Sequence, residues 1–320
     1  MDNNGSKNKT RVKALRLQHL PPDILSDVLS RLEFKEAARM SILSRKWRRL
    51  WRCYENLVFT RETMFSSGSN AVRNRHKAVP VVLLLDHCAS CFTNLKKLKL
   101  DGVSVPGHLQ CLLPECAVLE WLSIVRCTLH GLQTSQPLYR LRYLRVQHCE
   151  GMRKVEIQVP NFDVFKFHDS PMAIVLNGCL ALAEATVALL ASSDCFNHAF
   201  TVLPSGIPHA RKLNMELIMC GNTKMQEFTK CPTVFFNLKH LVLTMEMFRH
   251  HDEHTGGIIR LAYLLELAPV LEELELHLEW HGTGQFILWD LRTYCPRAPE
   301  ATQSSEGASD HWSVQLQESV

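Results

Sequence analysis

Hydrophobic positions of the form LxxLxL recur along most of the chain. Copies begin at Leu95, Leu119, Leu141, Phe162, Leu182, Ala210, Leu238 and Leu271, and those at Leu182 and Ala210 are the weaker ones. Successive copies start 24, 22, 21, 20, 28, 28 and 33 residues apart. Each copy predicts one short strand with a buried apolar row. One unit cannot bury that row alone, so stacked units must share a continuous core.

A strand-forming unit of roughly 20–30 residues is typical of leucine-rich repeats. We therefore predict an α/β fold, an irregular leucine-rich-repeat solenoid or horseshoe, over residues 95–295. Cys127 and Cys149 each follow their copy's first residue by eight positions. This is where a small polar or thiol side chain commonly closes the turn in this class of repeat, so we interpret both as buried repeat cysteines.

Side chains alternate between the two faces of a strand, so the residues between the leucines are expected on the concave surface. By this count that surface carries Lys97, Lys99, Asp101, Trp121, Ser123, Val125, Tyr143, Arg145, Gln147, Val164, Lys166, His168, His240, Val242, Thr244, Glu273, Glu275 and His277. The side chains of this surface are mostly basic and aromatic at the start of the array and acidic at its end. We expect a target to bind there through Lys97, Lys99, Trp121, Tyr143, Arg145, Lys166, Glu273 and Glu275. The alternative is a solvated face without a partner.

Residues 20–51 show a different pattern, that of three short amphipathic helices. Leu20-Pro21-Pro22-Asp23 is a helix-entry signal, because proline is tolerated in the first turn and an acidic residue is favoured there. A second helix is expected from Phe34 and a third after Ser44, which can cap it. Helices of about ten residues are marginal alone. One apolar face is therefore expected to dock on another surface.

Composition and charge limit the classes of protein. The 46% apolar and 21% charged residues are those of a globular chain. No apolar run approaches the roughly 20 residues of a membrane helix, and the N-terminus lacks the apolar core of a secretory signal. Residues 1–60 hold 13 Lys/Arg and 6 Asp/Glu, a charge of +7, and the other 260 residues hold 23 and 26, a charge of −3. A basic N-terminal segment suits nucleic acid or an acidic protein surface.

The segment around residues 18–56 resembles an F-box, the module by which substrate receptors attach to the Skp-type adaptor of cullin–RING ubiquitin ligases. The residues that carry this resemblance are Leu20, Pro21, Asp23, Ile24, Leu25, Leu29, Leu32, Ala37, Ala38, Ser41, Leu43, Ser44, Trp47, Leu50 and Trp51. The phrase LSRKWRRLW is similar to the plant form. The resemblance implies adaptor contacts by Leu20, Pro21, Ile24, Leu25, Leu29 and Trp47, with Ser44 and Trp51 shaping the same surface.

With the repeats included, residues 18–297 resemble the plant F-box/leucine-rich-repeat family, whose members are often followed by an FBD segment. LAPVLEELEL and FNLKHLVL are typical phrases. The resemblance implies a non-catalytic substrate receptor of a Skp–cullin–F-box ubiquitin ligase in the nucleus or cytoplasm. Its partners would be the Skp-type adaptor, the cullin and RING subunits behind it, and an unidentified target protein. The alternatives are a nucleic-acid-binding protein that uses SRKWRRLW and a repeat scaffold outside any ligase.

We expect five segments: a disordered basic N-terminus (1–17), the F-box (18–56), a linker or degenerate first repeat (57–94), the repeats (95–295) and a disordered polar tail (296–320). The short stretch from 60 to 94 and the tail depart from the family pattern, and we interpret them as signs of a shortened or alternatively spliced form. We expect no membrane partner, cofactor, catalytic residue or metal. A lone CxxC at Cys88–Cys91 lacks a second ligand pair, and the histidine-rich run at 250–254 is not an HExxH motif.

Overall fold

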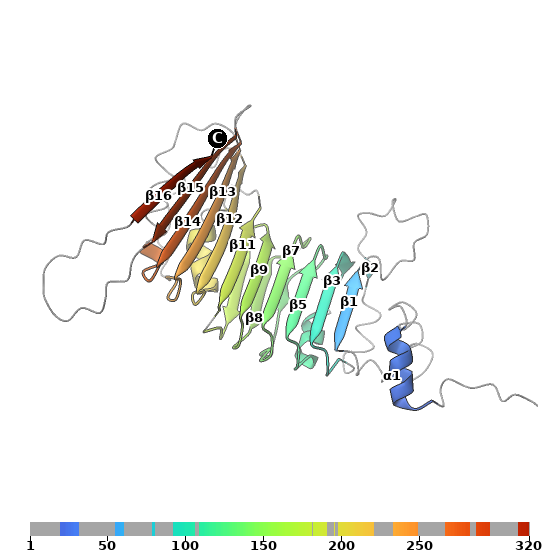
Figure 1. The fold of residues 1–320 in the computed structure, drawn as a ribbon. Coiled ribbons are helices and arrows are strands. Elements are labelled where there is room, and N and C mark those ends of the chain that lie inside the picture. The colour runs from blue at the N-terminus through green and yellow to red at the C-terminus, as the bar shows by residue number, and fades with distance from the viewer. Residues whose placement is uncertain are drawn as a thin grey trace, which may run out of the picture.

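The computed structural model describes residues 20–31, 55–60, 79–80, 92–105, 109–180, 182–190, 195, 198–220, 233–248, 266–281, 286–294 and 313–319. An 11-stranded sheet runs through these residues, and its strands lie side by side from β1 next to the N-terminal helix to β16 (Figure 1). The strands, in their order across the sheet, are β1 (Asn56–Thr60), β3 (Lys97–Asp101), β5 (Trp121–Val125), β7 (Tyr143–Gln147), β9 (Val164–Asp169), β11 (Glu184–Leu189), β12 (Lys212–Cys220), β13 (His240–Phe248), β14 (Glu273–His281), β15 (Phe286–Tyr294) and β16 (Ser313–Ser319).

All eight repeat strands predicted from the leucine pattern are present. Each begins two residues after the start of its LxxLxL copy, including the two weaker copies, which form β11 and β12. These strands are parallel, and the middle apolar residue of each copy pairs with that of the next, as Leu98 does with Leu122. The register is therefore constant although the copies are 20 to 33 residues apart. The connecting segments absorb the difference in length.

The core of the repeats is the row of apolar side chains on one face of this sheet. Leu98, Leu122, Leu144, Phe165 and Ala185 are among its buried members. Phe165 lies between Phe162 and Phe167, with ring centroids 6.3 Å from each. Because parallel strands are bonded to neighbours of the same kind, each repeat buries its apolar row against those of the two beside it. This is the continuous core that the spacing predicts.

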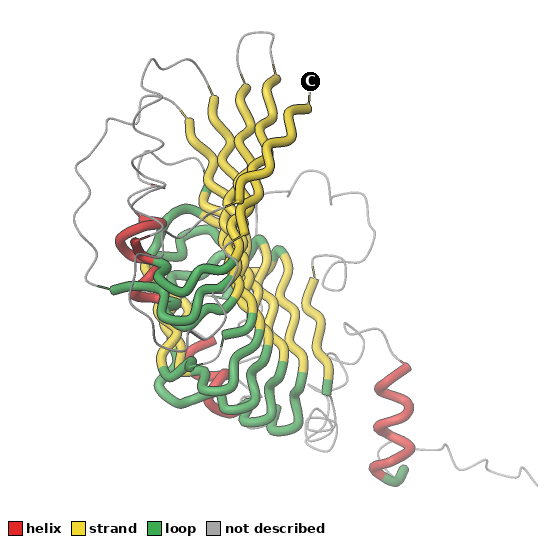
Figure 2. Tube along the Cα trace, turned by 60° about the vertical axis from the view of Figure 1, so that its left-hand side comes forward, coloured by secondary structure: helices red, strands yellow, loops and turns green. Residues whose placement is uncertain are grey.

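The second layer differs from the helices usual in an α/β horseshoe. Figure 2 shows the main sheet as one layer of strands, with loops and short helical turns behind it. The second layer contains a three-stranded parallel sheet of β6 (Leu132–Gln133), β8 (Lys154–Gln158) and β10 (Ala173–Asn177), and a pair formed by β2 (Val79–Pro80) and β4 (Val103–Ser104). Helical turns occur at α6 (Leu109–Leu112), η4 (Leu113–Glu115), η5 (His198–Val202) and α8 (Leu203–Gly206).

The sequence of the middle repeats explains this second layer. Apolar and polar residues alternate in β8, and buried and less buried positions alternate in both β8 and β10, with Val155, Ile157, Ile174 and Leu176 buried. Alternation with period two favours a strand over a helix. The middle copies are also only 20 to 22 residues apart. Two turns and a returning strand fit into that length, whereas little of it remains for a helix.

Both ends of the main sheet extend beyond the predicted repeats. β1 pairs with β3 in the repeat register, Leu57 with Leu98 and Phe59 with Leu100, so a repeat-like strand precedes the first predicted repeat. At the other end β15 is antiparallel to β14, and β16 is antiparallel to β15. β16 lies within the segment expected to be a disordered tail. Its sequence SVQLQES alternates apolar and polar residues at Val314 and Leu316, a strand pattern within a polar segment.

The turn after β9 is held by a buried carboxylate that the sequence pattern does not single out. The backbone N–H of Cys149 donates to Asp169 Oδ2 at 2.6 Å, and the N–H of Ser170 donates to Asp169 Oδ1 at 2.8 Å. Only 9% of Asp169 is exposed. One side chain thus satisfies two backbone donors and ties neighbouring repeats together.

Replacing Asp169 by alanine is expected to lower the free energy of unfolding by about 1–3 kcal/mol, because the buried Cys149 N–H would lose its acceptor. The urea midpoint of the full chain, followed by circular dichroism, measures this. Asp163→Ala is the matched control on the same repeat, since Asp163 forms an exposed ion pair with Arg142 at 3.2 Å. Exposed pairs contribute about 0–1 kcal/mol. Equal midpoints for the two variants would contradict the role assigned to Asp169.

Candidate protein-interaction surfaces

The first candidate surface lies on α1 (Pro22–Arg31), the helix that the entry signal predicts. Asp23 lies in the first turn and Arg31 in the last, where each charge opposes the helix dipole favourably. The N–H of Leu25 donates to the carbonyl of Pro21 at 3.1 Å and closes the first turn. Asp27 and Arg31 form an ion pair at 3.1 Å along the exposed side.

Two of the residues proposed to bind an adaptor are open to solvent. Pro21 is exposed and Ile24 is 48% exposed, whereas Leu20 is partly buried. Leu25 is completely buried and belongs to the core, so its side chain points inward. The side chain of Leu29, and Ser44, Trp47 and Trp51, lie outside the part that the structure describes, as do the second and third predicted helices.

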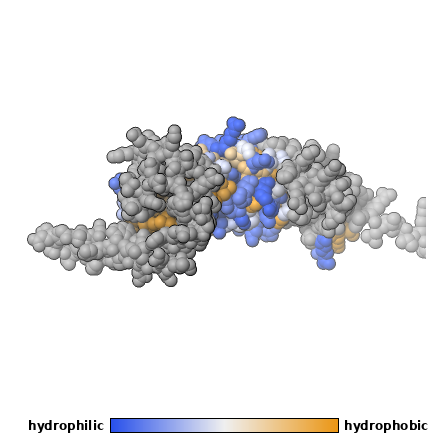
Figure 3. All heavy atoms as spheres, turned by 90° about the horizontal axis from the view of Figure 1, so that it is seen from above, coloured by the Kyte–Doolittle hydropathy of each residue, from blue (hydrophilic) through white to orange (hydrophobic). Residues whose placement is uncertain are grey.

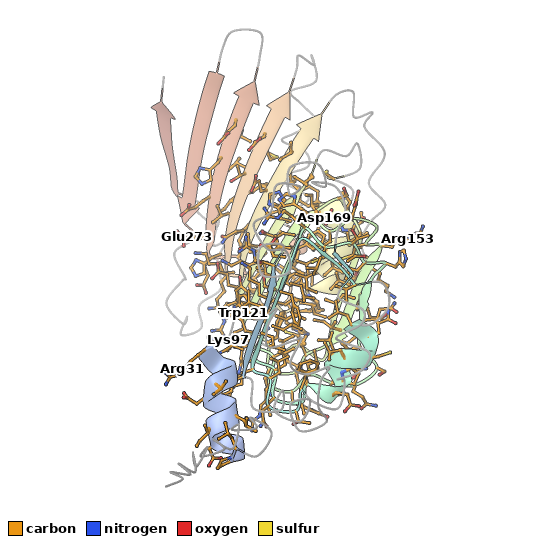
Figure 4. The ribbon with its side chains drawn as sticks, turned by 90° about the vertical axis from the view of Figure 1, so that its right-hand side faces the viewer. Arg31, Lys97, Trp121, Arg153, Asp169 and Glu273 are labelled. Carbon is orange, nitrogen blue, oxygen red and sulfur yellow. The ribbon has the colours of Figure 1, made fainter. Side chains whose placement is uncertain are left out.

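The second candidate surface is the face of the main sheet opposite the core, which we call the open face. Figure 4 shows Lys97, Trp121 and Glu273 along one side of the molecule and Arg153 on the opposite side. Two rows of side chains cross the strands. The first row runs Lys97, Trp121, Tyr143, Val164, Glu184, Lys212, His240, Glu273, and the second runs Lys99, Ser123, Arg145, Lys166, Thr186, Asn214, Val242, Glu275. All eight residues predicted to bind a target lie in these two rows.

An aromatic platform lies near the start of the first row. The rings of Trp121 and Tyr143 are stacked, with centroids 5.2 Å apart and planes 6° from parallel. Both side chains are partly exposed, and Lys97 is the register partner of Trp121. Tryptophan and tyrosine side chains are typical anchors of protein interfaces, and stacking fixes the orientation of these two rings.

Arg145 lies beside this platform in the second row. Its Nη2 donates to Gln147 Oε1 at 2.5 Å, while its buried Nε has no hydrogen-bond partner among the described residues. Lys166 is its direct register partner on β9. Like charges opposite each other on neighbouring strands destabilise a sheet. This pair of like charges therefore lowers the stability of the sheet.

Asp101 is the acidic residue among the open-face side chains of β3, β5, β7 and β9. Arg126 holds it at 2.6 Å, and Lys99 lies 3.6 Å from the other carboxylate oxygen. Asp101 is therefore already neutralised. Lys97, Arg145 and Lys166 form no ion pair with any residue that the structure describes.

The far end of the open face is acidic, and some of its carboxylates are paired. Glu273 contacts Nδ1 of His240 at 2.6 Å, and Glu275 lies 3.6 Å from Nε2 of His277. β14 is five strands from β7, about 24 Å at a strand spacing of about 4.8 Å. Arg145 and Glu275 therefore lie at well-separated places on the open face.

The repeat pattern misses some residues of the open face and misplaces one. β11 and β12 contribute Glu184, Lys212 and Glu216 to the open face. No open-face residue is predicted from the sequence in these two weak copies. Alternation within them would have been the signal. Ser123, expected at the surface, is only 1% exposed. Its short side chain lies between the longer Lys99 and Arg145 in the row.

Two histidines lie in contact at the carboxyl ends of β7 and β9. The rings of His148 and His168 have centroids 4.4 Å apart. Burial lowers the pKa of His168 below its ordinary value and His148 lowers it further, whereas Glu216 and Asp169 act in the opposite direction. His168 is therefore uncharged at neutral pH, and the positive charge of this region comes from lysine and arginine.

Cys127 and Cys149 are structural cysteines. The thiol of Cys127 donates to the carbonyl of Val125 at 3.3 Å, and that of Cys149 to the carbonyl of Gln147 at 3.3 Å. Burial raises the pKa of Cys127 to about 11 and that of Cys149 to about 12. Both remain protonated and unreactive at neutral pH. The interpretation as buried turn residues is confirmed.

Within the described ranges, no three His, Cys, Asp or Glu side chains are grouped closely enough to hold a metal ion. Cys88–Cys91 and residues 250–254 lie outside those ranges. No helix in the described part of the chain is both long and apolar enough to cross a membrane. Seen from above, the coloured surface is mostly hydrophilic with scattered hydrophobic residues (Figure 3).

Comparison with known proteins finds two domains of known families in this chain. The model of an F-box domain matches residues 17–58, and the model of the At1g61320/AtMIF1 LRR domain matches residues 81–302. No curated protein matches the chain. The repeat-domain match covers more than half of the 320 residues, so the chain belongs to the plant F-box/leucine-rich-repeat family whose repeat domain is of the At1g61320/AtMIF1 type.

Proposed function

We propose that this protein is the substrate-recognition subunit of a Skp–cullin–F-box ubiquitin ligase. Its F-box binds the Skp-type adaptor, and through it the cullin and RING subunits, while its repeats bind a target protein in the nucleus or cytoplasm. The observation that carries the proposal is the combination, in one chain, of an F-box match with a repeat sheet whose outer face is open and patterned in charge. F-box and leucine-rich-repeat families are interaction modules.

The contribution of this chain would be positional and not chemical. The partner subunits carry the thioester and transfer ubiquitin, and the receptor holds a target lysine near it. Holding two reactants together raises their effective concentration, which accelerates a reaction without a catalytic side chain in the receptor. None of the residues named on either surface is assigned a catalytic role.

Three features of α1 support a role in adaptor binding. The helix follows the Leu20–Asp23 entry signal, it exposes an apolar residue at Ile24, and its buried side is anchored by Leu25. An exposed apolar helix face that docks in a partner's groove is a common recognition mode. A standard interface buries about 800 Å² on each partner, an area within reach of the three short helices that the sequence predicts for residues 20–51.

Co-expression with a Skp-type adaptor tests the proposal. We expect the full chain and the adaptor to elute together from size-exclusion chromatography as a one-to-one complex. Adding the cullin and RING subunits should extend the complex. A full chain that is folded by circular dichroism and yet elutes apart from every Skp-type adaptor tried would reject the ligase assignment and favour a free-standing repeat scaffold.

A further inference from the structure

The open face has opposite charges in its two halves, although every strand is built on the same leucine pattern. Over β3, β5, β7 and β9 it carries Lys97, Lys99, Arg145 and Lys166 against Asp101. Over β11 to β14 it carries Glu184, Glu216, Glu246, Glu273, Glu275 and Glu279 against Lys212. The periodicity of the repeats requires none of these charges, because they lie on the face away from the core.

We propose that the basic half binds an extended acidic segment of the target, with a carboxylate on Arg145 and an apolar or aromatic side chain of the segment on the Trp121–Tyr143 platform. The proposal rests on the function proposed above and specifies the chemistry of the target. The acidic half repels the same segment, so the two halves together set where and in which direction the segment lies. Repulsion of wrong placements is a common source of specificity.

The state of Arg145 is the main support for this occupant. Its Nε is buried and lacks a partner in the part of the chain that the structure describes, and Nη2 is bonded to the neutral side chain of Gln147. Arginine donors that are left unsatisfied are costly. A carboxylate accepts two parallel hydrogen bonds from the fork of a guanidinium. A carboxylate of the target would therefore supply the missing acceptor once the side chain turns its Nε edge toward it.

The surroundings of Arg145 support the same occupant. Lys166 is its register partner, so two cations lie next to each other with no carboxylate between them. An incoming anion would turn this repulsion into attraction. Lys97 extends the positive strip past the platform, while Asp101 is held by Arg126 and does not compete. His168 adds no charge at neutral pH, because burial keeps its pKa low.

Fluorescence anisotropy of the full chain with a fluorescein-labelled decapeptide of alternating glutamate and glycine tests the proposal. Decapeptides with lysine or glutamine in place of glutamate are the charge controls. We expect the glutamate peptide to bind, the other two to bind at least tenfold more weakly, and binding to weaken as salt rises. Arg145→Ala should weaken binding at least tenfold. Arg145→Lys should be intermediate, because lysine keeps the charge and loses the fork.

Arg153→Ala is the matched control, because Arg153 is exposed and lies on the opposite side of the molecule (Figure 4). It removes the same charge and should change the affinity less than twofold. Equal loss in the two variants would overturn the proposal, since binding would then follow net charge alone. Tighter binding of a thymidine decanucleotide than of the glutamate peptide would also overturn it, and so would a concentration-dependent dimer abolished by Arg145→Ala.

Adaptor co-elution measured on the same samples separates the two proposals. Intact co-elution without peptide binding would reject the acidic segment and leave the ligase role standing. Peptide binding without co-elution would reject the ligase role and leave the acidic recognition standing. A melting curve for Arg145→Ala that matches the parent chain shows that a loss of binding is not a loss of folding. If the melting curve of Arg145→Ala shifts, the peptide affinity of Arg145→Lys is compared with that of the parent chain instead. Equal affinities would reject a role for the guanidinium fork of Arg145.

Discussion

Alanine at both Leu20 and Pro21 is expected to abolish capture of a Skp-type adaptor while the repeats stay folded. Pro21 is exposed and Leu20 is partly buried at the start of α1. Burying one large apolar side chain in an interface is worth about 1.5–3 kcal/mol, which corresponds to about 10- to 100-fold in affinity. Loss of the rigid proline at the helix entry adds to this effect. Pull-down with immobilised adaptor, followed by titration, measures the loss.

The control for this double variant is Leu180→Ala, which removes the same kind of side chain from a repeat turn where it is 70% exposed. It should capture the adaptor as the parent chain does. Circular dichroism should be unchanged in both proteins, because none of the changed residues belongs to the buried row of the sheet. Normal adaptor capture by the double variant would mean that the helix entry is not part of the interface.

Replacing Phe165 by alanine is expected to lower the free energy of unfolding by about 3–5 kcal/mol. Phe165 is completely buried in β9 and contacts the rings of Phe162 and Phe167. β9 lies in the middle of the main sheet, between β7 and β11, so the cavity would open between two repeats on either side. The walls belong to strands held in register, and they cannot collapse far to fill it.

Urea unfolding of the full chain measures this loss, and Phe236→Ala is the matched control. Phe236 is 52% exposed in the turn before β13, where it stacks on His209. Its removal should cost about 1 kcal/mol or less, the contribution of one exposed aromatic pair. A Phe165→Ala variant as stable as Phe236→Ala would contradict a continuous core across the repeats.

The irregular spacing of the repeats has a simple structural consequence. Copies 20 to 22 residues apart return through short strands such as β8 and β10, whereas the 28-residue interval between the copies at Leu182 and Ala210 contains the helical turns η5 and α8. In α8, Gly206 is packed so closely that a Cβ atom there would lie 1.9 Å from the carbonyl oxygen of Ile174 on β10. A glycine is therefore needed at position 206, where α8 packs against the three-stranded sheet of β6, β8 and β10.

The F-box motif predicts where α1 begins, but it does not predict which of its side chains are buried. The entry residues Leu20 to Asp23 predict a helix at Pro22, and α1 begins there. The motif also implies that Leu25 contacts the adaptor. In the folded chain Leu25 is buried, while Ile24 is open. A motif specifies which residue types recur, and the direction of each side chain depends on how the helix is packed.

The leucine spacing alone determined the eight parallel repeat strands, their register and the side on which Lys97, Arg145 and Glu275 lie. It could do so because burial of one apolar row fixes both the pairing and the alternation of a strand. Only the tertiary structure decided that Ser123 is covered, that Asp169 bonds Cys149 in the preceding repeat, and that β15 and β16 run antiparallel. It also decided that Arg145 lies beside Lys166 and that neither forms an ion pair with a described residue. These features arise between residues of different strands, and contacts across strands leave no period in the sequence of either one.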